Sequence, residues 1–138
     1  MKVLLLTFEE NEEDTLTRIL SCIGNRTEIL EYEDKGILQF EGLCIDKFKR
    51  IVVRDGNEIE LTYTEFEILL LLAQNAGIIF SKEQIYEAVF GYDGTADDTA
   101  VTQHIKNIRA KLRTAGVAAP ETVLKTIWGV GYQWKSET

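Results

Sequence analysis

The segment from Asp97 to Arg113 carries the pattern that most limits how this chain can fold. Its apolar side chains recur at helical spacing and share one face of a helix: Val101, Ile105, Ile108 and Leu112. Polar and small side chains crowd the opposite face: Thr99, Gln103, Lys106, Asn107, Ala110 and Arg113. Asp97 or Asp98 can cap the start, where backbone N–H groups lack partners. The pattern therefore predicts an amphipathic helix that is held by one face.

The charge of this helix leaves two interpretations open. Between Thr102 and Arg113 the segment has four cations and no acid. It can be an ordinary surface helix with a solvated basic side. It can also be a helix that is docked by its apolar stripe, with amide and cationic side chains directed at a nucleic-acid groove. The flanking segments decide between the two.

The segments upstream predict a small sheet followed by short helices. From Ile37 to Leu61 the apolar pattern has a period of two, and Asp55-Gly56 between two such runs is a strong hairpin signal. Thr62–Glu65 matches a capping box, and Thr64–Glu67 offers a second one a turn later. Ser81–Gln84 matches another, which predicts a helix that ends at Gly91.

The segment downstream predicts a β-hairpin. Val123–Ile127 alternates, Gly129-Val130-Gly131 gives a tight reversal, and Tyr132-Gln133-Trp134 returns. A short helix, a loop and a basic amphipathic helix are the ingredients of a helix-turn-helix, and a hairpin directly after them has the position of a wing. This succession favours the nucleic-acid interpretation.

The acidic charge is concentrated at the front of the chain. The net charge is −8, but residues 1–41 hold 4 Lys/Arg against 10 Asp/Glu, whereas residues 42–138 hold 11 against 13. The front predicts a strand at Lys2–Thr7, a helix at Glu9–Ile23 and a strand at Thr27–Glu33, too little to bury a core alone. We therefore expect two parts, residues 1–36 and 37–138, with the first docked on the second or on another copy.

Composition argues against several other classes. The Met1–Leu6 run is too short for a signal peptide or a membrane span, so a cytoplasmic location is expected, with no membrane partner. Cys22 and Cys44 lack metal-ligand spacing and are expected to be reduced, so neither a metal nor another cofactor is predicted. With one histidine, no phosphate loop and no catalytic carboxylate cluster, the chain is not expected to be an enzyme.

Four sequence runs in register resemble the effector domain of OmpR/PhoB-type response regulators of two-component systems. They are LTYTEFEILLLLAQNAG, SKEQIYEAVFG, TAVTQHIKNIRAKLR and KTIWGVGYQW, within residues 38–134. The resemblance implies an α+β winged helix-turn-helix: an N-terminal antiparallel sheet, three helices and a C-terminal hairpin wing, preceded here by the strand-helix-strand segment. It implies a transcriptional regulator that binds double-stranded DNA as a homodimer, with the third helix in the major groove and the wing at the adjacent minor groove.

Carried over position by position, the resemblance also implies DNA contacts. The implied base readers lie on the exposed face of the third helix: Ala100, Thr102, Gln103 and Asn107. The implied phosphate contacts are His104, Lys106, Arg109, Thr126, Tyr132 and Phe90, with weaker candidates at Thr62, Thr64 and Lys82. Other roles stay open: His104 can be a packed histidine, Tyr132 and Trp134 can be core aromatics, and Arg109 can pair with an acid of the preceding helices.

The sequence departs from that family at three places. Thr99 and Trp128 stand where the family often has arginine, which predicts weaker single-site binding that depends on dimers. Trp128 at a wing tip can wedge in a groove or pack on a neighbouring protein. The front is far shorter than a phosphate-receiving domain, so residues 1–36 are expected to be either a truncated receiver-like segment or a dimerisation segment, and control by aspartyl phosphorylation is not expected. The alternative function is a protein-binding winged-helix module, for example one that contacts RNA polymerase.

Overall fold

The computed structural model describes residues 6–23, 35–40, 42–91 and 98–135. The chain forms two compact units, Met1–Glu33 and Asp34–Thr138, and each is described by itself. In the first unit, helix α1 spans Glu13–Ile23. It begins later than the predicted Glu9, because the Glu12 amide donates to the Glu9 carbonyl at 3.0 Å and its carboxylate accepts from the Glu9 amide at 3.0 Å, which closes a turn.

The two strands predicted for the front are not established. The segment Thr27–Glu33 lies outside the described residues, as does most of Lys2–Thr7. Leu6 and Thr7 are described, and they are not in a strand. Leu16, Ile19 and Leu20 of α1 have half-buried apolar side chains, and they recur at helical spacing.

The second unit begins with a four-stranded antiparallel sheet in chain order. Its strands are β1 (Ile37–Phe40), β2 (Leu43–Asp46), β3 (Ile51–Arg54) and β4 (Asn57–Ile59). The predicted hairpin between β3 and β4 is confirmed: Asp55 and Gly56 form a two-residue turn with φ of 48° and 84°. Two successive positive φ values are what a type I′ turn needs, and Asp-Gly tolerates them. Leu43, Ile45 and Val52 bury one face of the sheet.

Four helices follow in the described residues of this unit: α2 (Tyr63–Gln74), α3 (Lys82–Phe90), α4 (Asp98–Thr114) and the short α5 (Pro120–Val123). Two predicted capping boxes are confirmed, since Thr62 caps α2 with Glu65 and Ser81 caps α3 with Gln84. The second box, Thr64–Glu67, does not start a helix, because α2 has already begun there. Glu67 instead forms an ion pair at 2.6 Å with Arg50.

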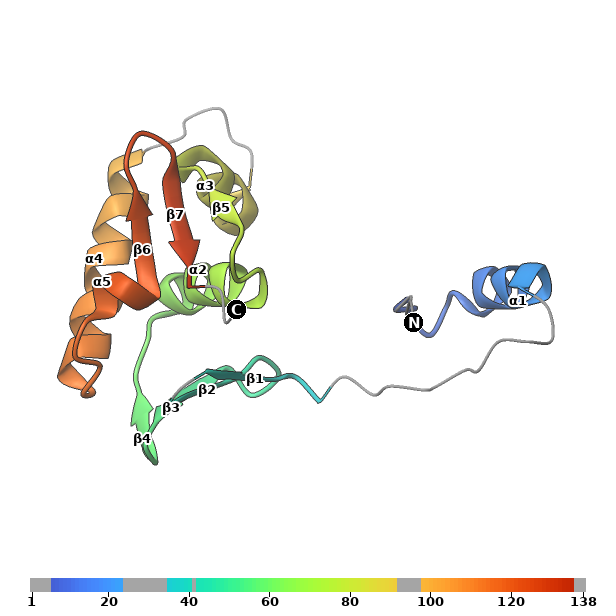
Figure 1. The fold of residues 1–138 in the computed structure, drawn as a ribbon, viewed down its shortest axis with the longest axis horizontal. Helices are drawn as coiled ribbons and strands as arrows, with labels where there is room; N and C mark the ends of the chain where they lie inside the picture. Colours follow the sequence, from blue (N-terminus) through green and yellow to red (C-terminus); the bar gives the residue numbers. More distant parts are fainter. Residues whose placement is uncertain (1–5, 24–34, 41, 92–97, 136–138) are drawn as a thin grey trace. The chain divides into compact units, whose positions relative to one another are not determined.

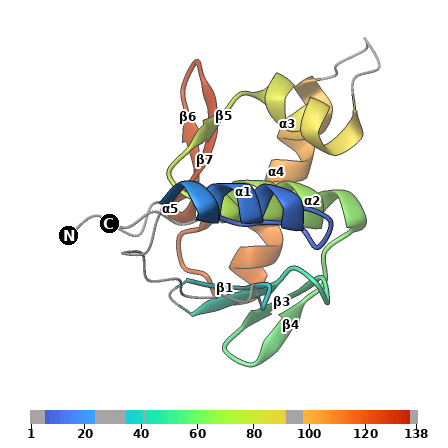
Figure 2. The same ribbon diagram turned by 90° about the vertical axis from the view of Figure 1, so that its right-hand side faces the viewer.

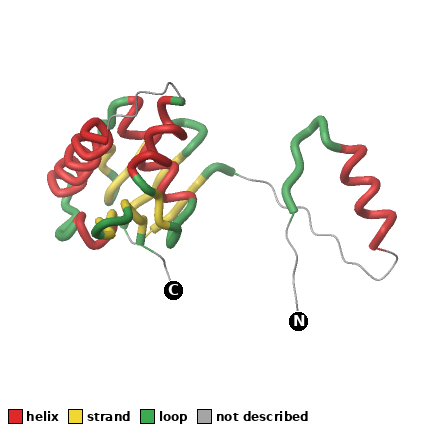
Figure 3. The backbone as a smooth tube through the Cα atoms, turned by 90° about the horizontal axis from the view of Figure 1, so that it is seen from above, coloured by secondary structure: helices red, strands yellow, loops and turns green. Residues whose placement is uncertain are grey.

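A second sheet has the order β5-β7-β6. Its strands are β5 (Ile79–Phe80), β6 (Leu124–Ile127) and β7 (Gly131–Trp134). The predicted hairpin is β6–β7, whereas β5 is not among the strands predicted from the sequence. Figures 1 and 2 show α2 between the four-stranded sheet and the β6–β7 hairpin, and Figure 3 distinguishes helices, strands and loops along the unit.

One hydrophobic core joins these elements. Helix α2 packs against α3, α4 and β7. The rings of Phe40 in β1 and Trp134 in β7 lie 5.2 Å apart, so the two sheets meet in this core. Trp134 is 1% exposed, which confirms the prediction of a core aromatic. The α4 stripe is also buried as predicted, with exposed fractions of 0 or 1% for Val101, Ile105, Ile108 and Leu112.

Candidate nucleic-acid interface

The exposed face of α4 is fixed in direction by its buried stripe. Gln103 and Lys106 are exposed, and Asn107 is half-buried. Gln103 Nε2 donates to Asn107 Oδ1 at 3.0 Å, so these two amides form a pair one helical turn apart. Ala100 and Thr102, the other predicted base readers, are half-buried. All four predicted base readers therefore lie on one helix, beside the exposed Lys106.

Arg109 is engaged with the hairpin. Its Nε and Nη2 donate to the Leu124 carbonyl at 3.1 and 2.6 Å, and Nη2 also donates to Thr126 Oγ1 at 2.8 Å. The guanidinium lies 5.8 Å from the Tyr132 ring centroid. The pKa of Arg109 is lowered from its ordinary value, because burial disfavours the charged guanidinium. Electrostatic interactions with Tyr132 and Glu121 act in the opposite direction and offset part of this effect. Arg109 thus joins α4 to both strands of the hairpin, rather than pairing with an acid of α2 or α3.

Two further cations of α4 also have partners inside the protein. Lys111 Nζ lies 2.5 Å from Glu65 Oε2, and the Glu65 side chain is 4% exposed. Arg113 forms an ion pair with Glu121 of α5. For Lys106, no ion pair is found among the described residues. Three of the four cations of α4 (Arg109, Lys111 and Arg113) therefore have partners within the protein. The sequence did not indicate the pairs of Lys111 and Arg113, because their partners lie outside α4.

The hairpin tip is apolar. Trp128 is 92% exposed and Val130 is 54% exposed. Thr126, on β6, is exposed and accepts from Arg109. Tyr132, on β7, is 5% exposed and belongs to the core, so its predicted phosphate contact could involve only that small fraction. The wing thus presents a tryptophan to solvent and keeps its tyrosine for packing.

His104 lies at the edge of the α4 stripe and is half-buried. Its ring centroid is 6.2 Å from that of Phe90, which in turn lies 4.8 Å from that of Tyr86. The buried His104 Nδ1 finds no hydrogen-bond partner among the described residues. His104 therefore packs between α3 and α4, as one of the two sequence interpretations has it, beside a Phe90 ring that is 41% exposed.

The remaining predicted phosphate contacts lie at helix starts. Thr62 is exposed, but its hydroxyl oxygen accepts from the Glu65 amide at 3.2 Å as the cap of α2. Thr64 lies in the first turn of the same helix and is half-buried. Lys82 is the first residue of α3 and is also half-buried. These residues are not on α4 or on the hairpin, and their predicted roles stay predictions.

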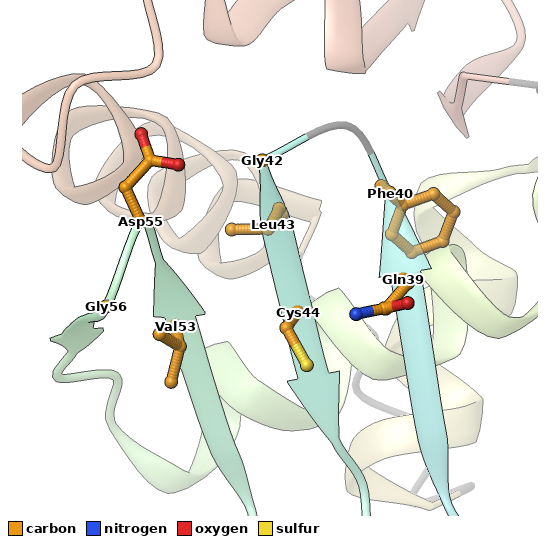
Figure 4. Close-up of a pocket in the computed structure, with 8 residues that line it drawn as sticks. All are labelled: Gln39, Phe40, Gly42, Leu43, Cys44, Val53, Asp55 and Gly56. Atoms are coloured by element: carbon orange, nitrogen blue, oxygen red, sulfur yellow. The ribbon is translucent and has the colours of Figure 1, made fainter.

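A hollow of about 230 Å³ opens over the ends of strands β1 to β3 (Figure 4). Gln39, Cys44 and Val53 lie side by side across its floor, since they are register partners in adjacent strands. Its ionisable lining residues are Cys44 and Asp55.

Both cysteines of the chain are free thiols: Cys22 is exposed and Cys44 is half-buried.

Within residues 6–23, 35–40, 42–91 and 98–135, no three His, Cys, Asp or Glu side chains gather as a metal site would require. None of the helices in this part of the chain has the length and apolar content of a transmembrane helix. That the protein binds neither a metal nor a membrane is predicted from the sequence, and it stays a prediction.

The geometry of the second unit defines a class of protein. Helices α2, α3 and α4 share one core, α3 packs against α4, and the β6–β7 hairpin follows and is bonded to α4. A helix pair of this kind with a C-terminal hairpin is a winged helix-turn-helix. The connection between α3 and α4 lies outside the described residues.

Comparison with known proteins places the chain within that class. Residues 56–134 match the family "Transcriptional regulatory protein, C terminal", and the chain belongs to this family. It carries a DNA-binding domain of the OmpR/PhoB type, which confirms the resemblance found in its sequence. The protein is 50% identical over 82 residues to Regulatory protein VanRB of Enterococcus faecalis, an alignment that covers 59% of this chain and 34% of VanRB.

Two solved structures show the same fold. The DNA-binding domain of Escherichia coli CpxR is 34% identical with a TM-score of 0.63, over 74% of this chain and 98% of that one. The DNA-binding domain of Klebsiella pneumoniae RstA, solved in complex with the RstA box, is 30% identical with a TM-score of 0.62, over 72% of this chain and 96% of that one. The chain spans between 34% and 51% of the length of several curated relatives that it matches.

Proposed function

We propose that this protein is a sequence-specific transcriptional regulator that inserts α4 into the major groove of double-stranded DNA. The observation that carries the proposal is the orientation of α4, whose apolar stripe is at most 1% exposed while Gln103 and Lys106 face solvent. A helix fits the major groove, where base edges present distinct donors and acceptors. The β6–β7 hairpin, which Arg109 holds beside α4, would then lie at the adjacent minor groove.

The proposal assigns the chain a binding role without a catalytic step. Binding as a pair of copies, contact with RNA polymerase and a cytoplasmic location stay predictions. The alternative function, a winged-helix module that binds protein only, is favoured by the 92% exposed Trp128 and by the net charge of −8. Contacts with DNA phosphates release condensed counterions, so DNA affinity falls steeply as the salt concentration rises. The salt dependence of DNA binding therefore distinguishes the two functions.

The first test is a salt titration of binding to duplex DNA. Log Kd should change linearly with log salt concentration, with a slope of about 0.9 for each phosphate contacted. Lys106→Ala should weaken binding to all sequences alike and reduce the slope by about 1, since one exposed cation is removed. Fluorescence anisotropy with labelled duplexes at several salt concentrations provides the measurement.

The matched control for this variant is Lys49→Ala. Lys49 is an exposed lysine in the turn between β2 and β3, on the sheet that Figure 1 places across α2 from the hairpin. Lys49→Ala removes the same charge as Lys106→Ala without changing α4. The salt slope of its DNA binding should therefore equal that of the unchanged protein. A flat salt response of the unchanged protein would contradict the proposed function and support the protein-binding alternative.

The wing gives a second prediction. Trp128→Arg should tighten DNA binding by roughly three- to tenfold at low salt and steepen the slope by about 1, because it adds a cation where a minor groove is expected. The 92% exposure of Trp128 means that the exchange disturbs no packing in the protein. Trp128→Ala, measured in the same anisotropy series, shows how much of the change in affinity comes from losing the indole ring rather than from adding a cation. If the arginine variant binds no more tightly than the alanine variant, the hairpin tip does not approach DNA.

A further inference from the structure

Two amide side chains on the exposed face of α4 are bonded to each other. Gln103 Nε2 donates a hydrogen bond of 3.0 Å to Asn107 Oδ1. The two residues are four apart in a helix, so their side chains are neighbours on its surface. Gln103 is exposed, and Asn107 is half-buried beside it. A base edge that approaches this face of α4 would therefore meet a coupled pair of amides.

The bond sets the direction of the Asn107 amide. A primary amide has its oxygen and nitrogen on opposite sides of a planar group, so an oxygen that faces Gln103 leaves Nδ2 pointing the other way. Oδ1 also keeps a second lone pair, since a carbonyl oxygen accepts two hydrogen bonds. Asn107 thus offers one acceptor and one donor in a fixed order, while Gln103 Oε1 makes no hydrogen bond among the described side-chain contacts.

That order matches one base in the major groove. Adenine presents the N7 acceptor beside the N6 amino donor, and asparagine can pair with both. Guanine presents two acceptors, N7 and O6, and the Asn107 oxygen would face one of them without a proton between them. Of the neighbouring predicted readers, Ala100 offers only a methyl group, and the Thr102 hydroxyl can donate or accept, so neither has the bidentate fork by which arginine selects guanine.

We propose that Gln103 is a positioning residue that holds the Asn107 amide in the orientation that reads adenine, so that the preferred DNA site has an A·T pair opposite Asn107. This inference rests on the proposed function, because it needs α4 in the major groove. It goes beyond that function by naming the base and by giving two neighbouring amides different roles: Asn107 contacts the base, and Gln103 orients it.

The test is to select preferred sites from a randomised duplex library with the unchanged protein, Asn107→Asp and Gln103→Glu. At one position the unchanged protein should prefer adenine about tenfold or more over other bases, as a bidentate pair allows. Asn107→Asp keeps the acceptor that Gln103 bonds but loses the donor to N7. Its preference should therefore shift from adenine to cytosine, whose N4 amino group is a donor.

Gln103→Glu should have a different effect. A carboxylate has no proton to give, so it repels Asn107 Oδ1 and instead accepts from Nδ2, which turns the amide away from the orientation that reads adenine. The adenine preference should fall at least severalfold, without a gain for cytosine. Gln103→Lys restores a donor at this position and should recover part of the preference. All these variants should keep the Tm of the unchanged protein, since Gln103 is exposed.

A second readout uses the DNA rather than the protein. Replacing the selected adenine with 7-deazaadenine removes the N7 acceptor and keeps base pairing. The unchanged protein should lose about tenfold in affinity, and Asn107→Ala should lose nothing further. The inference is overturned if Asn107→Ala keeps the adenine preference, or if Gln103→Glu reads the same base as strongly as the unchanged protein. A complete lack of salt-dependent DNA binding would instead contradict the proposed function.

Discussion

Replacing Arg109 with methionine is expected to lower the free energy of unfolding by about 2–3 kcal/mol and DNA affinity by roughly tenfold or more. The variant removes hydrogen bonds to the Leu124 carbonyl and to Thr126. Bonds from charged donors contribute more than neutral ones, and methionine leaves the carbonyl of the buried Leu124 without its guanidinium partner. Affinity should fall further than stability alone predicts, because the hairpin loses its attachment to α4.

The control for this variant is Arg113→Met in the same helix. Arg113 pairs with Glu121, but their side chains are 56% and 54% exposed, and an ion pair in water contributes about 0–1 kcal/mol. Arg109→Lys should lie between the two, since an ammonium group keeps the charge but lacks the planar fork that reaches two acceptors. Urea denaturation and anisotropy give both quantities. If Arg109→Met is no less stable than Arg113→Met, Arg109 does not hold the hairpin.

The elements that the sequence predicts well are those with local signals. The stripe of Val101 and Ile105 repeats at helical period, Asp55-Gly56 fits a two-residue turn, and Thr62 and Ser81 lie three residues before an acceptor side chain. Each of these signals involves residues within a few positions of one another. They are sufficient because periodicity and capping depend on the local backbone.

The elements that it misses depend on distant partners. Strand β5 has two residues, too few to show a period, and it exists because Phe80 pairs with Tyr132. Helix α5 is only Pro120–Val123. Its one signal was Pro120, since proline suits the first position of a helix. Short elements of this kind are set by the core on which they lie.

The candidate site shows the same division. The direction of Gln103 and Lys106 follows from the stripe, so the sequence predicts it. The engagement of Arg109 does not follow, because its acceptor is a backbone carbonyl that every residue possesses. The buried Glu65 was predicted as a capping residue, but its ion pair with Lys111 joins positions that lie far apart in the chain. Counting the cations of α4 therefore overstates the charge available for DNA.

Replacing Gly131 with alanine is expected to have the largest effect on the fold. A Cβ atom at this position would lie 1.9 Å from the Phe80 carbonyl oxygen and 2.8 Å from the Ser81 Cα. Both are backbone atoms, so relief requires β5 to separate from β7 rather than a side chain to turn. We expect a loss of about 3 kcal/mol in the free energy of unfolding, which corresponds to a fall in Tm of roughly 10–20 °C.

The comparison that isolates this contact is Gly129→Ala in the same hairpin. Nothing lies within 4 Å of a Cβ at Gly129, so only its φ of 76° opposes the exchange, at about 1 kcal/mol. Thermal unfolding followed by circular dichroism should therefore rank Gly131→Ala far below Gly129→Ala. Equal Tm values would mean that β5 does not hold β7 at this distance. Because β7 forms part of the wing, we also expect Gly131→Ala to bind DNA more weakly at temperatures where the variant is still folded. Gly129→Ala changes only the turn at the hairpin tip, so its DNA affinity should fall less.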